Sequence, residues 1–487
     1  MGKSNSERVP APVPARAACR GVCATVIGRM RVAWFSPLPP DRSGIAAYCA
    51  ELLPQLASRH DIEAFVDDGD RRPGTARPDP IAGVQVRGAH DFPWRYATQR
   101  FDVCVYQLGN QLCHDYIWPY MVRYPGLVVI HDGQLHHARA ASLIGRGRLD
   151  DYCAEFSYCH PHAPRALHEL VISGSGDTVG SLYYDHPMVR IPVEAARVAA
   201  VHNVLLAEEL SEQFAGAEVV PIRQGVRDLT AGETGRSDAL RARLGIPEAA
   251  VVFVAFGRVT PEKRLSAVVK ALGLIKVSGL VPEPWLVCVG ATADYYDVCR
   301  DAAASGVADR VMVTGYVPDG ELGGYLALAD ACLCLRWPTG RETSASWLRC
   351  LAAGKPTVIS DLAHLSDVPV IDPRSMATLA VGSRPSEDRE PIALIVELTD
   401  EVQMLRLAIR RLAESRDLRE RLGRAARQYW SRHATIEHMA QDYEALLERT
   451  RTSQPNPHPP WPAHLVVDGT EQARVIASRM GVALDWL

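Results

Sequence analysis

The chain has 487 residues and a formal net charge of −4, with 47% hydrophobic and 23% charged residues. This length exceeds what one hydrophobic core supports, so at least two domains are expected. The composition is that of a soluble globular protein. The small net charge excludes the basic footprint of a nucleic-acid-binding protein. No apolar run approaches the roughly 20 residues of a membrane-spanning helix.

The first 29 residues are rich in Ala, Pro and Arg and carry no periodic pattern. Only the run GVCATVI at 21–27 is apolar, which is short for the core of a signal peptide. We interpret residues 1–29 as a disordered extension that precedes the folded part of the chain.

The twelve cysteines are scattered along the sequence. Several fall inside apolar runs that resemble strands, namely Cys104, Cys288, Cys332 and Cys334. Buried thiols of this kind are typical of a reduced, cytoplasmic protein and argue against a disulfide framework. One group could suggest a metal site: Cys153, Cys159, His160 and His162. Its spacing matches no standard zinc pattern, so no metal site is expected.

The stretch ARAASLIGRGRL at 138–149 is basic and helical in pattern. A solvated helix is the simpler interpretation, and a peripheral contact with the anionic inner face of a membrane is the alternative.

Between residues 30 and 224, short apolar runs alternate with helical patterns. The expected strands are Arg31–Phe35, Ile62–Val66, Val103–Gln107, Leu127–His131, Val198–His202 and Glu218–Ile222. This alternation predicts a parallel sheet covered by helices on both faces. After the first strand, a loop leads through Ser43 and Gly44 into a helical pattern at 45–58. Gly44 lets backbone approach a ligand closely, although a plain strand-to-helix turn would use it as well.

A second series of strands follows between residues 225 and 430. Its members are Val251–Phe256, Trp285–Val289, Val311–Thr314, Ala331–Leu335, Thr357–Ser360 and Val368–Ile371. The sequence therefore predicts an α/β protein with two doubly wound Rossmann-like domains, 30–224 and 225–430, and a hinge near 223–228. Ligands bind at the carboxyl ends of the strands in such sheets, so the two domains are expected to face each other across a cleft.

Residues 391–450 carry a helical pattern throughout, and the helix at 431–451 is expected to cross back to the first domain. Residues 452–487 form a Pro-rich linker and a short tail, to which the sequence assigns no function.

The stretch 331–361 combines a strand, a loop, a helix and a second strand. Thr343 or Ser344 is expected to cap the helix, and Gly354 and Pro356 end it. The unpaired N–H groups at the start of that helix favour an anion such as a phosphate. Glu342 lies at the mouth of this position, where an acid that merely complements the helix dipole is the alternative.

A similar pattern occurs at FGRVTPEKR, residues 256–264. Gly257 allows close backbone approach at the end of a strand, and Arg258 and Lys263 place two cations where a diphosphate would need them. The segment lacks the second glycine of a phosphate-binding P-loop. GSGDTVG at 174–180 has one residue too many for a dinucleotide fingerprint, so we expect a loop there.

Several segments together resemble the family 4 retaining glycosyltransferases of the GT-B fold, in a bacterial branch. These segments are FGRVTPEKR, VTGYVPDGEL, ADACLCLRWPT, GRETS and AAGKPTVISD in the second half, and WFSPLPPDRSGIAAY, VYQLGN and VVIHD in the first. The resemblance covers about residues 30–450.

The resemblance implies a nucleotide-sugar donor bound by the second domain and an acceptor bound on the side of the first. Arg258 and Lys263 would contact the diphosphate, and Glu342 the donor sugar. His131 would reach the donor sugar from the first domain, where a strand end paired with Asp132 is the alternative. The resemblance further implies that Gly257, Thr343 and Ser344 contribute to the nucleotide site. Ser43 and Gly44 would belong to the glycine loop.

One position departs from the family pattern. The family has a second acid eight residues after the first, where this chain has Cys350, or Arg349 if one residue is deleted. Thr343 to Ser360 contains no carboxylate at all. We therefore expect nucleotide recognition to differ from the family pattern.

The expected function is metal-independent transfer of a sugar, with retention, from a nucleotide-diphosphate sugar to a saccharide, lipid-linked or small-molecule acceptor, without a cofactor. Two alternatives stay open: a sugar-nucleotide-binding protein without catalysis, and a GT-B-fold epimerase acting on a nucleotide sugar.

Overall fold

The computed structural model describes residues 28–67, 78–174, 179–230, 236–280, 282–365, 368–379, 390–456, 460–467 and 470–482. Most of the expected N-terminal extension, residues 1–27, lies outside these ranges. So do residues 175–178 of the GSGDTVG segment.

The first domain contains a seven-stranded parallel sheet in the order β3-β2-β1-β4-β5-β6-β7. Its strands are β1 (Arg31–Phe35), β2 (Asp61–Val66), β3 (Val84–Gly88), β4 (Val103–Leu108), β5 (Leu127–Ile130), β6 (Val198–Val201) and β7 (Val219–Pro221). Its helices are α1 (Gly44–Ala57), α2 (Phe92–Gln99), α3 (Ile117–Arg123), α4 (His136–Gly145), α5 (Leu149–Cys159), α6 (Arg165–Ser173), α7 (Val179–Asp185), α8 (Arg190–Ala195) and α9 (Val204–Gln213).

The second domain has an eight-stranded sheet in the order β10-β9-β8-β11-β12-β15-β13-β14, in which only the β13–β14 pair is antiparallel. Its strands are β8 (Val251–Phe256), β9 (Pro284–Val289), β10 (Val311–Val313), β11 (Ala331–Cys334), β12 (Thr357–Ser360), β13 (Val370–Ile371), β14 (Thr378–Leu379) and β15 (Ala393–Val396). The helices that follow are α10 (Arg236–Arg243), α11 (Leu265–Val277), α12 (Val298–Ala304), α13 (Asp319–Leu328), α14 (Ala345–Ala352), α15 (Glu401–Glu414), α16 (Arg416–His433), α17 (Ile436–Thr452), α18 (Ala463–Val466) and α19 (Glu471–Arg479).

The central strands of both sheets are buried on both faces, which explains why these strands are continuous apolar runs. Val32 and Trp34 of β1 pack in the same core cluster as α1 and α17, whereas Ala33 and Phe35 face the cluster beneath α2 to α8. The predicted fold of two doubly wound domains is therefore confirmed.

One prediction about this fold is wrong. The sequence pattern assigned residues 391–450 entirely to helices, but Ala393–Val396 forms β15, which lies between β12 and β13 in the second sheet. Four apolar residues are too few to show a period of 2 or 3.6. The clear helical period of the residues that follow therefore decided the prediction for this segment. β3 at the edge of the first sheet was also missed, since only half of its side chains are apolar.

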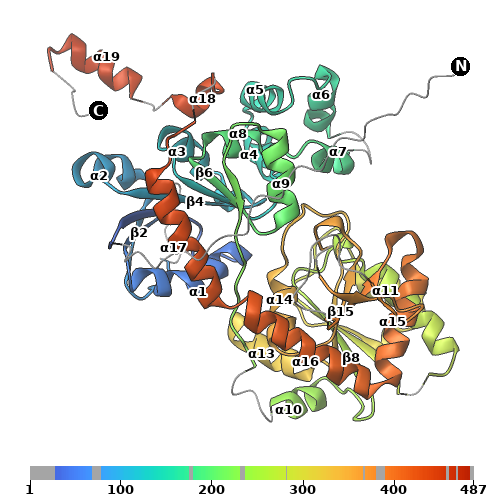
Figure 1. The fold of residues 1–487 in the computed structure, drawn as a ribbon. Coiled ribbons are helices and arrows are strands. Elements are labelled where there is room, and N and C mark those ends of the chain that lie inside the picture. The colour runs from blue at the N-terminus through green and yellow to red at the C-terminus, as the bar shows by residue number, and fades with distance from the viewer. Residues whose placement is uncertain are drawn as a thin grey trace, which may run out of the picture.

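The chain crosses between the domains twice. It leaves the first domain after β7 and returns after α16, and Figure 1 shows α17 lying against the first domain beside α1. Val226 N donates to Ala434 O over 3.0 Å where the two crossings meet, and Arg223 pairs with Asp442 of α17. Tyr443 of α17 is fully buried in the first domain.

Gly225 has no room for a side chain at this crossing, because a Cβ there would overlap the carbonyl oxygen of Thr435. We expect Gly225→Ala to destabilise the protein by about 1–3 kcal/mol and to lower the apparent Tm by about 2–10 °C. Gly320→Ala is the control, since a Cβ at Gly320 meets nothing within 4 Å. Thermal unfolding followed by circular dichroism measures both. Equal melting temperatures would show that the two crossings are loosely packed.

The tail is attached to the first domain through α18. Leu465 is buried in the core cluster of that domain, and His464 Nε2 lies 2.7 Å from Glu155 Oε1. α18 packs on α3.

The basic stretch 138–149 is not a solvated helix as a whole. Arg139 is only 3% exposed and forms a buried ion pair with Glu155, with Nε donating to Oε2 over 2.9 Å. Arg146 and Arg148 are paired with Asp115 and Asp151. Its arginines are thus occupied by carboxylates of the same domain. Among the helices of the described ranges, none combines the length and the apolarity needed to cross a membrane.

Candidate active site

The carboxyl ends of the strands from both sheets border one cavity of about 370 Å³ between the domains. The first domain contributes the loops after β1, β4 and β5, and the second contributes the loop after β11. This is the position at which doubly wound sheets bind ligands.

The loop after β11 fastens the second domain to the first. Gly133 N donates to Gly340 O over 2.6 Å, and the Thr343 hydroxyl donates to His202 O over 2.9 Å. Asn203 Nδ2 donates to Arg341 O over 2.8 Å. These hydrogen bonds join the loop after β11 to the residues that follow β5 and β6, on the other side of the domain interface.

Glu342 lines the cavity and is 15% exposed. Its Oε1 pairs with Arg336 Nε at 2.7 Å, and its Oε2 accepts a hydrogen bond from the Thr339 hydroxyl over 3.0 Å. Arg336 was not predicted as a site residue. It stands two positions after the end of β11, and this place at the end of a strand is its only sequence signal.

Lys263 ends a short 3₁₀ turn, Pro261–Lys263, after β8. A Cβ placed on Gly257 would lie 3.4 Å from Lys263 Nζ and 3.9 Å from the Ser346 hydroxyl, so the three residues meet at one point. Burial, reinforced by the charge of Arg336, lowers the pKa of Lys263 to about 8. Within the described residues, no hydrogen-bond acceptor is recorded for its ammonium group. Arg258 is exposed and is not among the residues that line the 370 Å³ cavity.

Ser344 caps α14, as one of the two predicted candidates, because its hydroxyl accepts a hydrogen bond from Trp347 N over 3.3 Å. Thr343 contacts the first domain instead. The N-terminus of α14 thus points toward the same region as Lys263 and Glu342, which together line a smaller adjoining cavity with Ser346.

Ser43 and Gly44 also border the 370 Å³ cavity. Ser43 caps α1 by accepting a hydrogen bond from Ile45 N over 3.2 Å. A Cβ on Gly44 would meet nothing within 4 Å, so this position is open.

His131 lines the cavity, but both of its ring nitrogens are already engaged. Nε2 lies 2.7 Å from Gln107 Oε1, and Nδ1 lies 3.1 Å from His202 Nε2. The Gln107 amide in turn contacts the hydroxyl of Tyr443, which is bonded to the hydroxyl of Tyr48. Burial, with smaller contributions from His202 and His114, lowers the pKa of His131 well below its ordinary value, so its imidazole is neutral.

Asp132 is a second carboxylate of the cavity wall. Its Oδ2 accepts a hydrogen bond from Asn110 N over 2.9 Å. Burial and the nearby charge of Glu342 raise the pKa of Asp132 to about 6. The domain interface thus brings two acids close together, Asp132 after a strand of the first sheet and Glu342 after a strand of the second.

Cys350 and Arg349 of α14, which stand where the family pattern has its second acid, make other contacts. Cys350 is fully buried, and its Sγ lies 4.0 Å from Cys334 Sγ. Arg349 donates to Glu51 Oε1 of α1 over 2.9 Å. This pair adds an ionic contact between the two domains.

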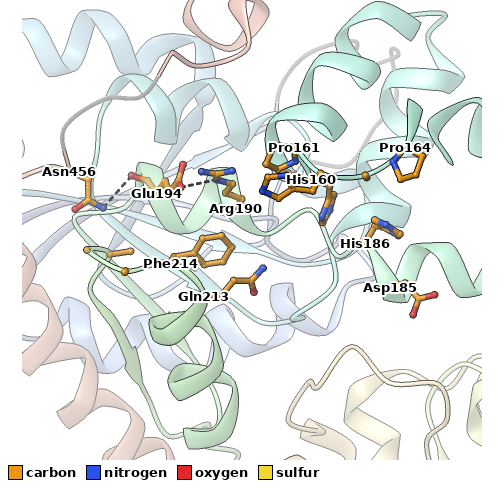
Figure 2. Close-up of a pocket in the computed structure, with 16 residues that line it drawn as sticks. His160, Pro161, Pro164, Asp185, His186, Arg190, Glu194, Gln213, Phe214 and Asn456 are labelled. Atoms are coloured by element: carbon orange, nitrogen blue, oxygen red, sulfur yellow. Dashed lines mark hydrogen bonds and ion pairs between the residues drawn. The ribbon is translucent and has the colours of Figure 1, made fainter. Parts of the chain in front are cut away.

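A larger cavity of about 810 Å³ lies on the flank of the first domain (Figure 2). Its cation, Arg190, is paired with Glu194 at 2.8 Å, and Glu194 also accepts a hydrogen bond from the Tyr158 hydroxyl over 2.5 Å. Glu194 thus neutralises Arg190, while Asp185 and three histidines, His160, His162 and His186, also line this cavity. In the part of the chain that the structure describes, no group of three or more metal-ligating side chains occurs.

Comparison with known proteins gives one family match and several proteins of similar fold. Residues 236–370 match the family model described as glycosyl transferases group 1. No curated protein sequence matches the chain.

Among solved structures, sucrose-phosphate synthase from Thermosynechococcus elongatus is similar, with 14% identity, a TM-score of 0.55, and coverage of 86% of this chain and 99% of that one. Anabaena HepE, solved with UDP and glucose, has 14% identity, a TM-score of 0.52, and coverage of 86% and 100%. The trehalose-phosphate synthase of Burkholderia vietnamiensis has 12% identity, a TM-score of 0.51, and coverage of 88% and 98%. At this identity the likeness concerns the fold. The chain thus has the GT-B glycosyltransferase fold, and its second domain carries the group 1 glycosyltransferase match.

Proposed function

We propose that the protein is a metal-independent retaining glycosyltransferase, which moves a sugar from a nucleotide-diphosphate sugar to an acceptor hydroxyl. The observation that carries this proposal is that Lys263, Ser344 and Glu342 line one small cavity at the start of α14, and that Glu342 also lines the adjoining interdomain cavity. The group 1 match supports a nucleotide-sugar donor. The acceptor belongs to the saccharides, lipid-linked molecules or small molecules.

The second domain supplies what the leaving group needs. When the bond between the anomeric carbon and the phosphate oxygen breaks, negative charge develops on the diphosphate. Lys263 and the N–H groups at the start of α14 stabilise that charge, and the exposed Arg258 is proposed to add a third contribution. Glu342 offsets the positive charge that develops on the sugar ring.

Retention is proposed to follow front-face attack. The acceptor oxygen bonds to the anomeric carbon on the face from which the phosphate leaves. Its proton passes to the departing phosphate oxygen, so no carboxylate nucleophile is needed. The resemblance to family 4 enzymes supports this course.

A panel of nucleotide sugars, analysed by mass spectrometry with the full chain, tests the function. We expect nucleoside diphosphate to be released from one donor, with sugar transfer or slow hydrolysis, at a rate that EDTA leaves unchanged. The anomeric configuration of the product, read by NMR, tests retention. An isomerised donor would support the epimerase, and binding without turnover the non-catalytic protein.

A further inference from the structure

Three thiols meet between β11 and α14. Cys332 and Cys334 are two residues apart on β11, so their side chains leave the same face of the sheet. Cys350 of α14 lies within hydrogen-bonding reach of both, and its Sγ is 4.0 Å from Cys334 Sγ. All three are free thiols in the structure. Because Cys350 stands where the family pattern has an acid, this cluster is a departure of this chain from that pattern.

The three thiols differ in their access to small molecules. Cys332 and Cys350 are fully buried, whereas Cys334 is half-buried. Cys334 lines the small cavity that is also lined by Lys263, Ser344 and Glu342. A reagent that enters this cavity therefore meets the sulfur of Cys334 before it can meet either of the other two.

Positive charge borders the same cavity. Lys263 and Arg336 both line it beside Cys334. Burial lowers the pKa of Lys263 to about 8, and the two cysteines Cys334 and Cys350 are among the groups that act in the opposite direction, so they lie within electrostatic reach of the ammonium. The attacking form of a cysteine is its thiolate, which nearby cations stabilise.

Cys350 is suited to the second of two steps. Burial, together with hydrogen bonds to Cys332 and Cys334, raises the pKa of Cys350 well above its usual value. Its thiol therefore stays protonated and does not attack a reagent first. It lies close enough to trap a Cys334 sulfur that has already been oxidised.

We propose that Cys334 and Cys350 form an oxidation site, at which hydrogen peroxide joins the two sulfurs in a disulfide beside the proposed diphosphate site. The Cys334 sulfur attacks one oxygen of the O–O bond, which gives a sulfenic acid and releases the other oxygen as water. The Cys350 sulfur then displaces the hydroxyl group from Cys334, and this hydroxyl leaves as water with the Cys350 proton. The two sulfurs together lose two electrons, which the peroxide takes up.

The disulfide requires a movement of α14. Since a disulfide bond is about 2 Å long, two sulfurs that are 4.0 Å apart must approach each other by about 2 Å. Ser344, which caps α14, lines the cavity together with Lys263 on the loop after β8. The movement displaces the start of α14 relative to Lys263, so we expect the oxidised protein to bind a diphosphate more weakly. This consequence rests on the proposed function, whereas the disulfide itself does not.

Peptide mapping of the full chain tests the disulfide. The reduced protein is treated with hydrogen peroxide, its remaining thiols are blocked with iodoacetamide, and it is cleaved with trypsin, which cuts after Lys and Arg but not before Pro. Cys334 then lies in peptide 311–336 and Cys350 in peptide 350–374, which contains no other cysteine. We expect these two peptides to be joined, with the loss of two hydrogen atoms.

Fragment ions of the joined peptides show whether Cys334 or Cys332 carries the bond, so the assignment can be made on the wild type alone. The joined pair should persist in Cys332→Ser, the matched control on the same strand, and should be absent from Cys334→Ser. No joined pair in the wild type, or a bond through Cys332, would overturn the oxidation site.

Calorimetric titration with UDP, GDP and ADP tests the consequence. The affinity for the nucleotide that the reduced protein binds should fall about 10-fold or more after peroxide, as for the loss of one hydrogen bond to a charged group. Dithiothreitol should restore it. Cys334→Ser should have the same affinity before and after peroxide, and Cys299→Ser, at an exposed position on α12, should respond as the wild type does.

The outcomes separate the two proposals. A joined pair with unchanged affinity, or an equal fall in Cys334→Ser, would overturn the effect of the disulfide on the diphosphate. A reduced wild type that binds none of the three nucleotides would overturn the proposed function, while the peptide map would still decide whether the oxidation site exists.

Discussion

Glu342→Gln is expected to lower kcat by about 10²- to 10³-fold, with a much smaller effect on donor affinity. The substitution preserves shape: the amide oxygen in the place of Oε1 can still accept a hydrogen bond from Arg336, and the amide NH₂ in the place of Oε2 can donate to the Thr339 hydroxyl. What it removes is a negative charge in a partly closed cavity, at the place where the sugar ring becomes positive. That interaction exists chiefly in the transition state, so its loss is expected in turnover.

The matched control is Glu321→Gln, which changes an exposed acid on α13 of the same domain. A second readout separates charge from structure. Because the charge of Glu342 raises the pKa of Asp132, the Gln variant should lower the pKa of Asp132, as followed by NMR of its side-chain carboxyl. Full turnover in Glu342→Gln would reduce Glu342 to an acid that complements the helix dipole.

The parts of the site that the sequence predicted are those that lie at strand ends. Lys263 and Glu342 each follow a short apolar strand, and parallel strands present their carboxyl ends on one edge. Their arrival at a shared region therefore depends only on topology, which the alternating pattern contained. Ser344 was likewise readable as a cap, because capping is a local property of the helix start.

The parts that the sequence did not predict depend on contacts between distant segments. His131 could be placed at the end of β5, but its two nitrogens are occupied by Gln107 and His202, which lie on β4 and just after β6. The contact of Cys350 with Cys334 and the pairing of Arg349 with Glu51 of the first domain also follow only from the tertiary structure.

Lys263→Ala is expected to weaken the binding of a nucleoside diphosphate by about 10- to 150-fold, which corresponds to about 1.5–3 kcal/mol for a hydrogen bond to a charged group. Because the diphosphate is shared by donor and product, UDP, GDP and ADP can be titrated without knowing the sugar. Lys270→Ala, an exposed position on α11, controls for the general effect of removing a lysine charge from this domain. An affinity of Lys263→Ala equal to that of the wild type would rule out the diphosphate contact.

The pH dependence gives an independent check on Lys263. Burial and the charge of Arg336 lower the pKa of Lys263 to about 8, so the ammonium is charged at neutral pH and loses its proton as the pH rises through about 8. The terminal phosphate is already ionised there, since its second pKa is about 6. Affinity of the wild type for the nucleoside diphosphate should therefore fall between about pH 7 and pH 9.5, whereas that of Lys263→Ala stays flat. A flat wild-type profile would mean that another group, such as Arg336, carries the diphosphate charge alone.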